Sequence, residues 1–318
     1  MRKKILAALF LSLGLNGAWA EGNGVNGAGS EVRTIKAPRF ARGLVEKWIE
    51  EYAKTEPGVT FQIVKGSGSQ ENTDLNIVSG SQDNNTKDFS HIVYFGETAV
   101  LPITARSSEA ARLLEGKHLN AKKLKQLFFL GDDMDEDMKK KAVSTSLHKQ
   151  FEHLIIYSGS NQASMATHFA RNLGEEAGNF RGKRIAGDDL FLNTAIAKDP
   201  LGVTFNALPN IFDLESRHLK SNLSLVGLDL KKGLSDTFSD DGLLDDILLL
   251  LETDKPSEVA VTQVGLTYNA ADEGVTRFLQ WVLESGTKYN HRYGLLNLDR
   301  RETSIQVSKI QNTLTAQK

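Results

Sequence analysis

The sequence predicts an α/β protein made of two lobes. Strand-like and helical stretches alternate along most of the chain. A strand, a helix and a strand with a short return stand near its start, which is typical of a parallel sheet. Two long extended segments, 98–104 and 260–270, are expected to cross between the lobes. About 300 residues at 40% apolar content are enough for one or two cores.

In the first third of the chain, a helix is expected over roughly 41–54, because Leu44, Val45 and Trp48 begin an apolar stripe at helical spacing. The dipeptide Pro57-Gly58 ends this segment, and β-branched residues then predict a strand. The strands expected here lie at 32–37, 59–64, 74–80, 91–96 and 98–104.

In the rest of the chain, Asn120 is expected to cap a short helix that stops at Gly131, and Asp188 or Asp189 to cap another that stops before Pro200. The acidic and basic run at 132–141 is expected to be a solvated turn. The expected helices are 120–131, 161–173, 187–200, 240–252 and a final one at 271–293, and the expected strands are 154–158, 202–208, 223–230 and 260–270.

The N-terminal segment is typical of a cleavable signal peptide. Three basic residues at 2–4 precede an apolar run at 5–15, which is too short to span a bilayer, and Ala18-Trp19-Ala20 fits a cleavage site. We expect a mature chain from Glu21, a flexible Gly- and Asn-rich leader at 21–30, and a periplasmic location.

Charge and composition narrow the function classes. Removing the three basic residues of the signal segment leaves 35 basic against 40 acidic residues, a net charge of −5. Nucleic acid is therefore not expected as a partner. The chain has no cysteine, so disulfides, thiolate chemistry and Cys-zinc sites are excluded.

No catalytic, cofactor or metal motif stands out. The sequence contains no nucleophile elbow, phosphate loop of nucleotide-binding proteins or dinucleotide fingerprint, so no cofactor is expected. His148 and His153 lie five apart, yet scattered solvated histidines are the simpler interpretation, and no metal is expected. An enzyme is therefore not expected, and a hydrolase has no catalytic constellation to support it.

The order of segments resembles the type II periplasmic solute-binding proteins, and among them the phosphate-binding components of ATP-driven importers. The last two of the four stretches that carry the resemblance are the more specific. The stretches are "LVEKWIEEYAKTEPGVTFQIVKGSGS", "LNAKKLKQLFFLG", "RGKRIAGDDLFLNTAIAKDPLGVTFNAL" and "GVTRFLQWVLESGTKYNHRYGLLNL".

The resemblance implies a two-lobed clamp with an oxyanion held in the cleft. One lobe would comprise 31–102 plus 263–318 and the other 103–262, each with a mixed, mainly parallel sheet flanked by helices and with two crossover strands as the hinge. Helix N-termini lined by small residues suit such a ligand. The ligand-binding residues implied are Arg39, Ser67, Gly68, Ser69, Ser158, Gly159, Ser160, Asn161 and Gln162.

The sequence departs from the family pattern at three places. Ala37-Pro38-Arg39-Phe40 replaces hydroxyl donors in the first loop, where Arg39 offers a charged donor or is a surface charge. Ile156 stands where the family has an arginine, and Asp74 is no clear match for its buried aspartate. Each charged hydrogen bond lost costs roughly 1.5–3 kcal/mol.

Two functions are therefore expected from the resemblance. In the first, the protein binds phosphate or a related oxyanion and presents it to a membrane transporter. In the alternative, which the departures favour, it has lost its ligand and is an interaction partner of a periplasmic or outer-membrane transport assembly. For Ser158 and Ser160, a plain helix-capping role remains a further alternative.

Overall fold

The computed structural model describes residues 32–64, 73–80, 91–129, 151–160, 165–231 and 234–317. Residues Glu31–Lys318 form one compact unit. The predicted signal peptide, the leader, Gly131 and the charged run at 132–141 lie outside the described residues. Within the described ranges, no helix is long and apolar enough to cross a membrane.

The described strands form one mixed sheet in the order β2-β1-β3-β9-β4-β7-β5-β6, with β8 also paired to β4. Pairing is parallel at both ends, where β1 joins β2 and β3, and β5 joins β6 and β7. It is antiparallel in the middle, around β4 and β9. The strands are β1 (Val32–Lys36), β2 (Thr60–Ile63), β3 (Leu75–Ser79), β4 (His91–Ala105), β5 (Ile155–Gly159), β6 (Lys183–Ile185), β7 (Gly202–Ala207), β8 (Leu223–Leu225) and β9 (Ala260–Tyr268).

Strand predictions were wrong at three places. The strand expected over 223–230 ends at Leu225, and β6 was not predicted. The segments 91–96 and 98–104 were expected to be two strands, but they form the single strand β4. Its register against β9 shifts between Tyr94 and Gly96, so the strand continues through a bulge instead of ending at the glycine. A Cβ on Gly96 would lie 2.7 Å from the carbonyl oxygen of Leu296, so glycine permits close approach of another segment here.

Helices flank the sheet, and each predicted helical segment overlaps with one of them. The helices α2, α8 and α11 were not predicted. Asn120 caps α3 as expected, since its Oδ1 accepts the N–H of Lys123 at 3.0 Å. The helices are α1 (Arg39–Thr55), α2 (Glu109–Leu114), α3 (Ala121–Phe129), α6 (Met165–Asn172), α7 (Leu190–Lys198), α8 (Leu208–Ile211), α9 (Leu244–Thr253), α10 (Glu273–Trp281) and α11 (Arg300–Ala316).

The expected final helix over 271–293 is only partly correct. The α-helical part is α10, and short π and 3₁₀ turns follow it up to Tyr293. The last helix of the described chain is α11, which the sequence analysis missed. Its buried side chains are Gln306 and Ile310, so α11 lacks the apolar stripe that identifies the other helices.

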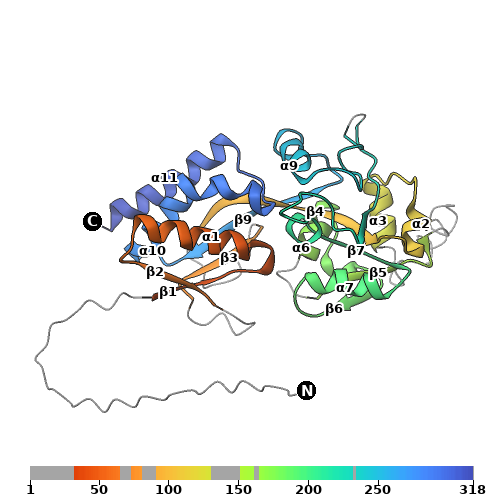
Figure 1. The fold of residues 1–318 in the computed structure, drawn as a ribbon, viewed down its shortest axis with the longest axis horizontal. Coiled ribbons are helices and arrows are strands. Elements are labelled where there is room, and N and C mark those ends of the chain that lie inside the picture. Colours follow the sequence, from red (N-terminus) through yellow and green to blue (C-terminus); the bar gives the residue numbers. More distant parts are fainter. Residues whose placement is uncertain are drawn as a thin grey trace, which may run out of the picture. The chain divides into compact units, whose positions relative to one another are not determined.

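Two hydrophobic clusters lie along the sheet. The first core includes Leu101, Phe128, Ile156, Phe169 and Phe205, and the second includes Leu44, Trp48, Val93, Leu266 and Phe278. The strands β4 and β9 contribute side chains to both cores, and Figure 1 shows these two strands passing between the two groups of helices.

Candidate functional site

The serine turn begins at the carboxyl end of β5. Ser158 is 1% exposed, and its Oγ is buried without a hydrogen-bond partner among the residues that the structure describes. Ser160 is exposed, and its backbone N–H donates to the carbonyl oxygen of Ile185 at 3.0 Å. The N–H of Ser160 therefore belongs to the pairing with β6 and is not free for an anion, while the Ser158 hydroxyl has an unused hydrogen-bonding capacity.

The face of the sheet on which Ser158 lies follows from strand register. Ile156 of β5 pairs with Val203 of β7, and paired residues share a face. Two positions further along, Ser158 therefore shares a face with Phe205. The Phe205 ring stacks on Phe169 of α6, with ring centroids 4.5 Å apart. Ser158 thus lies on the sheet face that α6 covers, near the carboxyl end of β5. In the sequence, α6 follows this end of the strand.

Asp189 meets the same end of α6 from another segment. Its Oδ2 accepts the backbone N–H of Met165, the first described residue of α6, at 3.0 Å. Its Oδ1 is buried and has no hydrogen-bond partner within the described ranges. Burial raises the pKa of Asp189 to about 6, the Met165 hydrogen bond opposes this shift, and the charge of Asp188 adds to it.

Asp188 and Asp189 contact the starts of two different helices. Asp188 caps α7, because its Oδ1 accepts the N–H of Leu190 at 2.8 Å. Asp189 instead places its carboxylate at the start of α6. The prediction that one of them caps α7 is thus met by Asp188, and the contact of Asp189 with a helix far along the chain has no signal in the sequence.

A buried amide network fixes the backbone around Asp189. The side chain of Asn206 on β7 donates to the carbonyl oxygen of Asp189 at 2.8 Å and to Oδ1 of Asn193 at 2.9 Å. Asn210 donates to Oδ1 of Asn206 at 2.8 Å. Since all three asparagines are buried and bonded to one another, they hold the starts of α7 and α8 against β7.

The start of α1 carries cations. Arg39 is its exposed first residue, Pro38 provides no side-chain cap, and the first turn contains no acidic residue. Lys220, which the sequence analysis missed, donates through Nζ to the carbonyl oxygen of Asn210 at 2.7 Å. Burial lowers the pKa of Lys220, while nearby Asp213 raises it and Arg39 lowers it further. Arg39 thus lies within electrostatic reach of Lys220.

Among the remaining predicted ligand residues, only Gly159 belongs to the described ranges. Gly159, the last residue of β5, is half-buried beside Ser158. Ser67, Gly68, Ser69, Asn161 and Gln162 lie outside the described residues. The predicted approach of the glycine-serine turn to the serine turn therefore stays a prediction. Among the residues that the structure describes, no group of His, Asp or Glu side chains is arranged to hold a metal ion.

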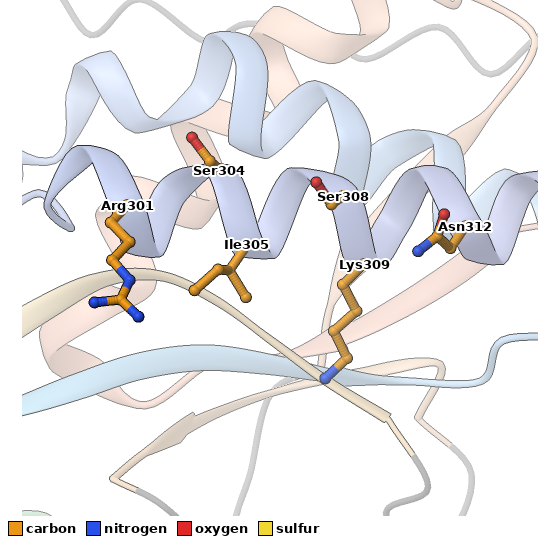
Figure 2. Close-up of a pocket in the computed structure, with 6 residues that line it drawn as sticks. All are labelled: Arg301, Ser304, Ile305, Ser308, Lys309 and Asn312. Carbon is orange, nitrogen blue, oxygen red and sulfur yellow. The ribbon is translucent and has the colours of Figure 1, made fainter.

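A surface depression lies elsewhere, along α11, and contains none of the predicted ligand residues. Figure 2 shows Arg301, Ile305 and Lys309 pointing from the helix towards the neighbouring strands. Lys309 donates through Nζ to the carbonyl oxygen of Ile92, and Gln306 accepts the N–H of Tyr94 at 3.1 Å. These contacts satisfy backbone groups of β4, so the helix protects part of that strand from pairing with other chains.

Comparisons with known proteins identify the fold. The structure resembles a phosphate ABC transporter substrate-binding protein from Clostridium perfringens, solved with bound phosphate, at a TM-score of 0.58 and 12% identity, covering 85% of this chain and 100% of that one. It also resembles an ABC-type phosphate transport receptor from Vibrio cholerae, at a TM-score of 0.52 and 12% identity, covering 84% and 100%.

No protein-family model matches the sequence, and no curated protein sequence matches it either. The structural likeness confirms the predicted α/β fold of type II periplasmic binding proteins, of the phosphate-binding-protein-like kind. At this level of identity, the likeness concerns the fold alone.

Proposed function

We propose that the protein is an exported binding protein that takes phosphate or a related oxyanion between two lobes and presents it to a membrane transporter. The lobes would be 31–102 with 263–318, and 103–262. The two cores support this division, although Ala99, Val100, Leu101 and Leu296 pack in the first core from outside 103–262. The periplasmic location rests on the predicted signal peptide.

The observation that carries the proposal is the Ser158 hydroxyl. It is buried on the sheet face that α6 covers and has no hydrogen-bond partner among the described residues, in a fold whose solved example from C. perfringens holds phosphate. A buried hydroxyl without a partner is costly in a protein interior. An oxyanion at the start of α6 would accept its hydrogen and interact favourably with the helix dipole.

Equilibrium dialysis with labelled phosphate, at about pH 5 and about pH 7.5, tests the proposal. We expect saturable binding to the wild-type protein and binding weakened about tenfold or more in Ser158→Ala, the cost of one charge-assisted hydrogen bond. Ser304→Ala is the matched control, because Ser304 is exposed on α11 and donates to the carbonyl oxygen of Arg300. Absence of binding up to millimolar phosphate at both pH values would remove the proposal.

A second candidate is an interaction module of a periplasmic or outer-membrane transport assembly that has lost its small ligand. The specific observation favouring it is the carboxylate of Asp189 at the start of α6, together with the engaged N–H of Ser160. Affinity capture from solubilised envelopes, with and without phosphate, distinguishes the candidates. A membrane complex retained in both conditions supports the module, and a solitary monomer contradicts it.

A further inference from the structure

A carboxylate of the protein itself lies where the proposed function places a bound anion. Oδ2 of Asp189 is 3.0 Å from the backbone nitrogen of Met165 and accepts its hydrogen. Negative charge is stabilised at a helix N-terminus, whether it comes from a side chain or from a ligand. Asp189 is therefore positioned to compete with an external oxyanion for the start of α6.

The negative charge of an ionised Asp189 is poorly stabilised at this position. Among the described residues, Oδ1 has no hydrogen-bond partner, Oδ2 has the single donor Met165, and no cation contributes to the pKa shift of Asp189. A buried carboxylate in such surroundings favours the neutral acid. A bound anion at the same helix end would disfavour the ionised form of Asp189 further, because two negative charges repel each other strongly in a site shielded from water.

An independent feature points to a ligand at the same place. Ser158 is more than nine-tenths buried, and its side chain lies on the face of the sheet that α6 covers. Its hydroxyl has no hydrogen-bond partner in the part of the chain that the structure describes. Asp189 meets the start of that helix but makes no hydrogen bond with Ser158. A group that accepts from Ser158 and from the start of α6 would satisfy the hydroxyl that Asp189 leaves unpaired.

We propose that Asp189 controls anion binding at this site, so that a tetrahedral oxyanion binds beside Ser158 and the start of α6 when Asp189 is neutral and is repelled when Asp189 is ionised. The inference rests on the proposed function and adds a specificity-determining residue to it. A neutral Asp189 also has a hydroxyl hydrogen that it can donate to the anion.

The pH dependence of anion binding is attributed to Asp189 because of the charge states of the groups around it. On its own segment Asp188 raises the pKa of Asp189. On α6, burial lowers the pKa of His168 to about 4, so its imidazole is neutral near pH 6, and Arg171 is in the last turn. From β7, the neutral amide of Asn206 donates to the carbonyl oxygen of Asp189. The same amide also donates to Asn193 of α7, which is neutral as well.

Calorimetric titration with sulfate at about pH 5 and about pH 7.5 tests the inference. Sulfate is the probe because it stays a dianion over this range, so a change in its affinity reports on the protein. The proteins compared are the wild type, Asp189→Asn and the matched control Asp188→Asn, which removes a charge one residue away. Asparagine at 189 keeps an oxygen that accepts the N–H of Met165.

We expect the wild type to bind sulfate about tenfold more tightly or more at the lower pH. Asp189→Asn is expected to bind tightly at both pH values. Asp188→Asn is expected to keep the pH dependence of the wild type, moved to slightly lower pH because the charge of Asp188 raises the pKa of Asp189. Equal affinity and equal pH dependence in the wild type and Asp189→Asn would overturn the inference and leave the proposed function standing. Absence of both sulfate and phosphate binding in all three proteins would overturn both. If Asp189→Asn does not fold by circular dichroism, the wild-type pH dependence decides, and binding that does not strengthen on acidification contradicts the inference.

Discussion

The Nε2 atom of His168 on α6 lies 2.9 Å from the hydroxyl oxygen of Ser79 at the end of β3. Its Nδ1 lies 3.3 Å from the hydroxyl of Thr262 on β9. Since α6 packs in the first core and β3 in the second, this imidazole joins elements of both cores. The side chain of His168 thus links α6, whose start carries the candidate site, to β3 and β9.

Replacing His168 with alanine is expected to destabilise the protein by about 2 kcal/mol, because it removes two hydrogen bonds and leaves a cavity beside Gly80. Urea unfolding measures this change. His153→Ala is the control, since His153 is exposed. Equal unfolding midpoints for the two variants would contradict the linking role of His168.

The pH dependence of stability is expected to contain a contribution from His168. Burial lowers its pKa from 6.5 to about 4, so between these values the unfolded state binds the proton more readily than the folded state. The contribution is constant above pH 6.5 and is lost as pH falls towards 4, by up to about 3 kcal/mol. Unfolding free energies of the wild type and His168→Gln across this range test it, and parallel curves would show that His168 does not titrate in this way.

Asp189 is expected to change the pH dependence of folding stability in the direction opposite to His168. Its pKa rises from 3.8 to about 6 on folding, so its stabilising effect is fully present below pH 3.8 and is lost as pH rises through about 6. At about pH 7.5, Asp189→Asn should therefore be more stable than the wild type by up to about 3 kcal/mol, and the advantage should shrink near pH 4. Thermal or urea unfolding at both pH values checks this. A variant less stable than the wild type at the higher pH would count against the assigned burial.

Gly80 is expected to tolerate no side chain. Its φ of +76° is a left-handed conformation, and a Cβ there would lie 2.4 Å from Cε1 of His168. Gly80→Ala should cost about 2 kcal/mol or more, whereas Gly58→Ala, with no atom within 4 Å of its added Cβ, is the control. In the double variant with His168→Ala, the part of the cost due to the clash should disappear, which a double-mutant cycle measures. Strict additivity would show that the clash does not contribute.

Arg181 is expected to be sensitive even to lysine. Its guanidinium donates to the carbonyl oxygens of Leu127, Leu154 and Phe151, and burial lowers its pKa to about 10. Lysine cannot reach three carbonyls with the same planar fork, so Arg181→Lys should lose about 2 kcal/mol or more in urea unfolding. Arg184→Lys is the control, since Arg184 is exposed. A loss no larger than that of the control would contradict the three-carbonyl role.

Local periodicity predicted the helices that bury an apolar face, such as α1 with Leu44 and Trp48. It missed α11, because a helix that buries Gln306 and Ile310 shows no stripe. It divided β4 at Gly96, because a glycine that serves the close approach of Leu296 looks the same in sequence as one that ends a strand.

The candidate site was predictable only in part. The position of Ser158 at the end of a strand followed from the apolar run before it and is confirmed. The engagement of Ser160 with Ile185 and the contact of Asp189 with Met165 join segments that are about 25 residues apart, and no local pattern encodes such pairs. Lys220 reaches Asn210 by the same kind of tertiary contact.

The pKa of Asp189, followed by the ¹³C chemical shift of its carboxyl carbon with and without sulfate, tests the account most directly. We predict a value near 6 in the free protein, because the carboxylate is buried at the start of α6 with one donor. We also predict a higher value when sulfate is present, because a bound anion opposes ionisation. A pKa close to 3.8 that does not respond to sulfate would contradict the account.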